Sequence, residues 1–68
     1  MDEERFNQSL RKLLKHFGVT AQREVEKAVR DALERGALRG DEALNARATM
    51  TVDGLPAPIQ VDGRIELG

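Results

Sequence analysis

The hydrophobic pattern changes its period once along the chain, and this change constrains the fold more than any other feature of the sequence. Up to Gly36 the apolar residues recur every three or four positions, which is the spacing of one face of a helix. From Leu44 onward they alternate with polar residues, which is the period of a strand with one apolar face. The sequence therefore predicts an α+β protein with its helical part first.

The helical part contains two apolar stripes with Gly18 between them, and this break predicts two helices, over about residues 2–17 and 21–35. Glycine often ends a helix in a left-handed conformation, and Thr20 is a good N-cap for a second helix. Gly36 is expected to end that second helix in the same way. The first stripe consists of Phe6, Leu10, Leu13, Leu14 and Phe17, and the second of Val25, Ala28, Val29, Ala32 and Leu33.

The alternating part predicts two strands, over about residues 44–52 and 59–67, joined by a loop rich in turn residues. A tight turn at Asp62-Gly63 is the alternative, but it would split the apolar face of the second strand. We therefore expect two antiparallel helices packed on one face of a C-terminal β-hairpin, in the order α-α-β-β. Residues 1–68 are expected to form this single small domain.

Composition excludes several classes of chemistry. The chain of 68 residues has no cysteine, so it has neither disulfides nor thiolate chemistry. Its one histidine, His16, has no further metal ligand at helical or turn spacing, and nothing marks any pair of carboxylates as buried. We expect no catalytic residue, no metal and no cofactor, so the protein is not expected to be an enzyme.

Charge and hydropathy indicate where such a protein would work. The net charge of −1 argues against a dedicated nucleic-acid binder, and no apolar run approaches the ~20 residues of a membrane span. The N-terminus is acidic, unlike that of a signal peptide. These features predict a cytoplasmic protein without membrane contact.

A protein-interaction module is the leading functional hypothesis. Both strands of a lone hairpin have unpaired edges, which a strand from a second copy or from a partner protein can satisfy. The first strand is the better candidate for such strand addition because its outer face carries little charge. The alternative is a stable monomer to which no strand is added. The candidate partner-binding residues are Gln22, Arg23 and Glu24 at the start of the second predicted helix, and Arg47, Thr49 and Thr51 on the first strand.

Weak nucleic-acid binding is the alternative function. Residues 1–40 carry a net charge of +2 and residues 41–68 a net charge of −3, so the basic residues gather in the helical part. Two helices with basic outer faces resemble a helix-turn-helix, although the third helix of that motif is missing. The candidate residues for this function are Arg11, Lys12, Lys15, Arg23, Lys27 and Arg30.

Several short runs of residues also point to a family. These runs are Phe6-Asn7, Ser9, Arg11-Lys12, Leu14-Lys15, Gly18 through Glu26, Ala28-Val29, Gly36, Leu38 and Gly40-Asp41-Glu42. With them, nearly the whole chain resembles a family of short uncharacterised bacterial proteins classed as a domain of unknown function. The resemblance implies a free-standing bacterial protein and implies no activity, cofactor or partner.

Overall fold

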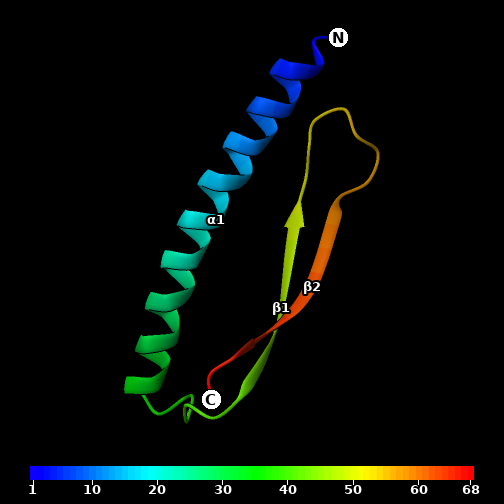
Figure 1. The fold of residues 1–68 in the computed structure, drawn as a ribbon. Coiled ribbons are helices and arrows are strands. Elements are labelled where there is room, and N and C mark those ends of the chain that lie inside the picture. The colour runs from blue at the N-terminus through cyan, green and yellow to red at the C-terminus, as the bar shows by residue number, and fades with distance from the viewer. The chain divides into compact units, whose positions relative to one another are not determined.

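The structure, a computed structural model, describes residues 1–68 and contains one helix followed by a two-stranded antiparallel sheet (Figure 1). The elements are α1 (Glu3–Glu34), β1 (Ala43–Met50) and β2 (Ile59–Glu66). The chain divides into two compact units, Met1–Ala37 with the helix and Leu38–Gly68 with the hairpin. The fold is α+β.

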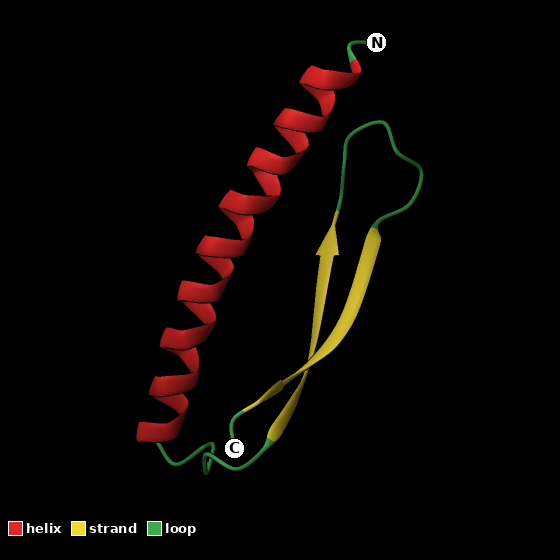
Figure 2. Cartoon of the chain, viewed as in Figure 1, coloured by secondary structure: helices red, strands yellow, loops and turns green.

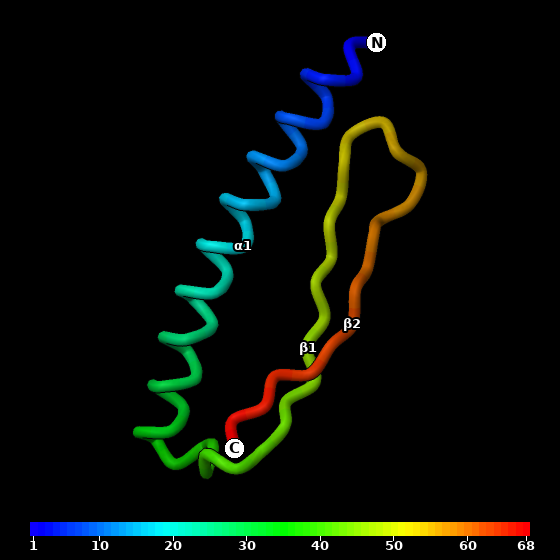
Figure 3. The backbone as a smooth tube through the Cα atoms, in the orientation of Figure 1, coloured from blue at the N-terminus to red at the C-terminus, as the bar shows by residue number.

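The prediction of two helices is wrong, because α1 runs without interruption through Gly18 and Thr20 (Figure 3). The two helices expected over residues 2–17 and 21–35 are one helix of 32 residues. The α-α-β-β order and an antiparallel helix pair packed on the hairpin are therefore wrong as well. Gly18 is not among the glycines with a positive φ, and the N-cap of α1 is Asp2.

Elementary energetics explain why the helix continues. A glycine inside a helix costs only about 1 kcal/mol relative to alanine, so it does not force a turn by itself. The chain has no proline before residue 56, and proline is the residue that would break the helix. Phe17, Ala21 and Val25 follow one another at intervals of four, so they join the two apolar stripes on one side of a single helix.

Both ends of α1 are capped. The Asp2 carboxylate accepts a hydrogen bond from the Arg5 N–H at 3.0 Å, and Glu3 and Glu4 place further negative charge at the positive end of the helix dipole. At the other end Gly36 has a φ of 75°, in the left-handed region. The Gly36 N–H donates to the Leu33 carbonyl at 3.2 Å and the Ala37 N–H to the Ala32 carbonyl at 2.9 Å, the pattern of a Schellman motif.

The hairpin is a twisted ribbon of two strands of eight residues each (Figure 2). Its register places Leu44 opposite Ile65 and Met50 opposite Ile59, so the apolar residues of both strands share one face. The strand β2 continues through Gly63, with no turn there. The other face carries the cross-strand pairs Asn45–Arg64, Arg47–Asp62 and Thr49–Gln60.

No residue of the chain is buried. Large apolar side chains are widely exposed in both units, including Phe17 at 54% and Val61 at 64% of their accessible surface. Neither unit therefore encloses a core of its own. The expectation that residues 1–68 form one domain stays a prediction.

Candidate functional site

The first group of candidate residues lies in the interior of α1. Gln22, Arg23 and Glu24 were expected in the first turn of a second helix, but that helix does not exist. The Gln22 side-chain amide donates to Glu26 Oε1 at 3.0 Å, and Glu26 pairs with Arg30 at 3.7 Å, one turn further on. These contacts are the i, i+4 contacts of an exposed helix surface, and they contribute a few tenths of a kcal/mol each.

The second group belongs to the hairpin unit. Arg47 and Thr49 lie on β1, on the face opposite the apolar one, and Thr51 lies just beyond the end of β1. Arg47 Nε donates to Asp62 Oδ1 at 2.7 Å across the two strands. The charge of Arg47 is therefore compensated within the hairpin, and the outer face of β1 carries no unpaired charge. The structure thus places the two groups in different units.

An open depression crosses the hairpin at this ion pair. It is lined by Asn45, Ala46, Arg47, Asp62, Gly63 and Arg64. Gly63 lies opposite Ala46 in the register, and an added Cβ at Gly63 would meet nothing within 4 Å. Its polar groups are exposed, which distinguishes it from the concave and mostly apolar pockets that bind small molecules.

The basic candidate residues all lie on α1. Arg11, Lys12 and Lys15 take part in none of the ion pairs of the structure, whereas Arg30 pairs with Glu26. The helix-turn-helix resemblance does not hold, because no turn separates two helices here. What remains is a basic segment on the first half of one long helix.

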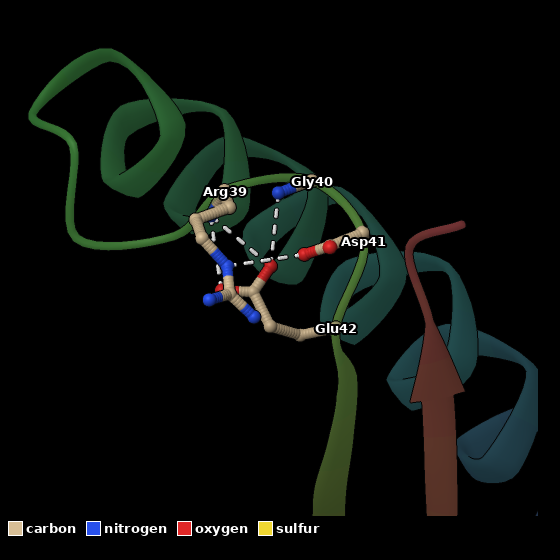
Figure 4. A network of polar contacts seen from close by, with 4 residues as sticks. All are labelled: Arg39, Gly40, Asp41 and Glu42. Carbon is tan, nitrogen blue, oxygen red and sulfur yellow. Dashed lines mark hydrogen bonds and ion pairs between the residues drawn. The ribbon is translucent and has the colours of Figure 1, made fainter.

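The connection between α1 and β1 holds a polar network that sequence reasoning missed (Figure 4). The Glu42 carboxylate accepts hydrogen bonds from the N–H of Arg39, at 2.9 and 3.1 Å to its two oxygens, and from the N–H of Gly40 at 2.9 Å. Arg39 Nε donates to Asp41 Oδ1 at 3.2 Å. The Glu42 carbonyl also accepts from the Leu67 N–H at 2.9 Å, which joins the start of β1 to the end of the chain.

This network lowers the pKa of Glu42 below its ordinary value. The largest cause is the hydrogen bond from the Arg39 N–H, followed by that from the Gly40 N–H, because both stabilise the ionised carboxylate. Glu42 therefore occupies backbone amides that would otherwise be free to bind an anion. Its role is to hold the loop, and the signal that could have revealed it is the acidic residue two positions after Gly40.

Neither a metal centre nor a membrane span is present in the structure. No group of three or more His, Cys, Asp or Glu side chains is placed to hold a metal ion. Although α1 is long enough to cross a bilayer, its hydropathy falls short of that of a spanning helix.

Comparison with known proteins gives a family and no function. No curated protein and no solved structure matches the chain. A model for a family described as "Family of unknown function (DUF6494)" matches residues 1–68, which confirms the resemblance to a domain of unknown function. The chain therefore belongs to this family of unknown function.

Proposed function

We propose that the protein is a non-catalytic protein-interaction module of a bacterial cytoplasm, and that it completes its hydrophobic core by binding another protein chain. The observation that carries this proposal is that neither unit buries a residue within itself. Folding must offset a conformational entropy cost of about 1–2 kcal/mol per residue, mostly through burial of apolar surface. A unit that buries so little by itself gains that surface by association, and another protein chain is the proposed partner.

The edge of β1 is one surface where a partner strand would add. A hairpin of two strands leaves one edge of each strand unpaired, and such a hairpin is marginally stable alone. On β1 the one charged side chain, Arg47, is already paired with Asp62. On β2 the outward-facing residues Arg64 and Glu66 remain as charges that discourage strand addition.

A photo-crosslinking amino acid at Thr49, with the same replacement at Gln60 as the matched control, tests this edge. The two positions are direct cross-strand partners, so both labels lie on the same face at the same level. We expect covalent products with a second chain from Thr49 and far fewer from Gln60. Equal yields from both positions would contradict a preference for the β1 edge.

Amide hydrogen exchange across a hundredfold dilution tests the proposal as a whole. If association completes the core, dilution should dissociate the complex to single chains of 7.6 kDa. The slow-exchanging amides of α1 should then lose their protection from exchange. Full protection at that mass, at every concentration, would show that the chain is complete without a partner and would overturn the proposal.

Nucleic-acid binding is a second candidate, favoured by one observation: Arg11, Lys12 and Lys15 have no acidic partner in the structure. Such binding would weaken steeply between ~50 and ~200 mM salt, because counterions compete for the phosphates. It would also fail in the variant with alanine at all three positions. An affinity that neither change affects would exclude this candidate.

A further inference from the structure

The long helix carries an apolar seam that continues through Gly18. We define the α1 seam as eight residues at intervals of four, three, four, four, four, three and four. These residues are Phe6, Leu10, Leu13, Phe17, Ala21, Val25, Ala28 and Ala32. The average interval is about 3.7 residues per turn, close to the 3.6 of a straight helix, so the seam stays on one side along the length of α1.

The α1 seam is mirror-symmetric in position about the level of Val19. Its members form four pairs equally distant from that residue: Phe6 with Ala32, Leu10 with Ala28, Leu13 with Val25, and Phe17 with Ala21. In each pair the residue from the first half of the helix is large and the one from the second half is smaller. Two copies of α1 laid antiparallel would therefore place a large side chain against a smaller one at each of these four levels.

A parallel pair would fit poorly for two reasons. It would set Phe6 and Phe17 against their own copies in one half and alanines against alanines in the other, whereas packed helices need a matched separation of about 8–10 Å along their length. It would also place the segment from Arg5 to Lys15, which has four basic residues and no acidic one, beside itself. The antiparallel arrangement sets that segment against residues 23–33, where basic and acidic residues balance.

The large side chains of the α1 seam are not covered within the helical unit. A standard protein interface removes about 800 Å² from each partner. Within the seam, Phe6 is 49% exposed, Leu13 51% and Phe17 54%, so the large side chains are available to a partner.

We propose that α1 is a self-association element, and that two copies pair antiparallel through the α1 seam, centred at the level of Val19. This inference rests on the proposed function and names the partner of one surface as a second copy of this chain. Shape supplies the specificity, because large residues of one copy fill the space above the small residues of the other.

A pair of neighbouring substitutions tests the seam. Phe17 and Val19 have similar exposure but point to opposite sides of the helix, since two residues span about 200°. Light scattering after size exclusion should give twice 7.6 kDa for the unaltered chain and for Val19→Asp, and 7.6 kDa for Phe17→Asp. A mass of 7.6 kDa for the unaltered chain throughout, or a Phe17→Asp variant that still dimerises, would overturn the inference.

A swap of residues keeps the test valid if the charged variant unfolds. Phe17→Ala leaves two alanines facing each other, and Ala21→Phe forces two phenylalanines together, so each change should raise the dissociation constant at least about tenfold. The double variant Phe17→Ala/Ala21→Phe restores one large and one small residue at that level and should recover most of the affinity. A double variant as weak as the two single changes combined would contradict the pairing.

Introduced thiols test the orientation, because the chain has no cysteine of its own. Leu10→Cys and Ala28→Cys chains are unfolded together, refolded as a mixture and allowed to oxidise in a glutathione buffer. Antiparallel pairing predicts disulfides between a Leu10→Cys chain and an Ala28→Cys chain, which mass spectrometry separates from the two homodimers. Homodimers alone would contradict the antiparallel arrangement. If the chain stays monomeric at every concentration and its α1 amides are unprotected from hydrogen exchange, a second copy is excluded as the partner. The broader proposal, that a different protein completes the core, would still hold.

Discussion

The helix and the hairpin differ in where their apolar side chains find neighbours. In the hairpin every apolar side chain of β1 has a cross-strand neighbour in the same unit, as in the pairs Leu44–Ile65 and Met50–Ile59. In α1 all backbone hydrogen bonds are local, and no second helix exists in the chain to face its seam. Alternation thus supplies a partner strand within the same unit, whereas a long amphipathic helix finds no partner for its apolar face within its own unit.

The two units also depend on different local devices. The ends of α1 are set by the Asp2 cap and the left-handed Gly36, while the hairpin begins at a loop held by the Glu42 carboxylate. Changes at these positions therefore alter one unit at a time, and they test whether the contrast between the units is real.

The largest effect is expected from Gly36→Val, which acts on the helix end. Gly36 has a φ of 75°, where a side chain with a Cβ costs about 1–2 kcal/mol, and a β-branched one costs the most. Thermal unfolding followed by circular dichroism should show this loss, whereas Ala37→Val, at an ordinary φ, should show much less. Equal behaviour of the two variants would contradict the Schellman end of α1.

Gly18→Ala should change stability in the opposite direction. An added Cβ at Gly18 meets nothing within 4 Å, and alanine is favoured over glycine inside a helix by about 1 kcal/mol. The helical signal and the unfolding temperature should both rise. If a turn stood at Gly18, the same substitution would lower both, so this variant tests the continuity of α1 directly.

The stability of the hairpin unit should depend on pH through Glu42. Because the folded-state pKa of Glu42 is lowered, its carboxylate stabilises the loop above the ordinary glutamate value of 4.5. That stability is lost as the pH falls through the lowered folded-state pKa. An NMR titration of the Glu42 side chain should give the lowered value directly.

The variant Glu42→Gln provides the control for this titration. It should flatten the acid side of the stability profile of the hairpin while leaving that of α1 unchanged. A Glu42 side chain that titrates at 4.5 or above would show that its bonds to the Arg39 and Gly40 amides do not persist in solution.

The smallest effect is expected at the Arg47–Asp62 ion pair. Its side chains are 63% and 66% exposed, so solvent screens their attraction and the pair contributes about 0.2–1 kcal/mol at most. A double-mutant cycle with Arg47→Ala and Asp62→Ala, followed by denaturant unfolding, should give a coupling energy in the low part of that range. A coupling above about 1 kcal/mol would show that the hairpin buries this pair more deeply.

Sequence patterns predicted the strands and the end of the helical part because those signals are strong and local. Alternation from Leu44 and from Ile59 corresponds to β1 and β2, which run over Ala43–Met50 and Ile59–Glu66, against expected ranges of 44–52 and 59–67. The prediction of a helix pair is wrong because a single glycine does not end a helix whose apolar side continues past it. The intervals from Phe17 to Ala21 to Val25 show this continuity in the sequence.

The candidate binding residues were less accessible to sequence reasoning. The sequence predicts a helix start at Gln22, Arg23 and Glu24, and their position inside α1 follows only once Gly18 is known to be helical. The Arg47–Asp62 pair depends on the register of the hairpin, which brings together residues fifteen positions apart. The Glu42 network depends on a loop conformation with Gly40 at a φ of 105°, and periodicity does not encode such a conformation.

The distance between two spin labels at Asn7, one on each copy, tests the central claim most directly. Asn7 is exposed and lies twenty-four residues from its mirror position at Asp31, so antiparallel helices centred at Val19 place the labels about 36 Å apart. Pulsed electron paramagnetic resonance should detect this distance in the unaltered background and lose it in Phe17→Asp. A distance of about 20–24 Å or less, within two helix diameters, would indicate a parallel pair and would contradict the claim. The claim would also be contradicted if no distance between labels were detected at concentrations that saturate association.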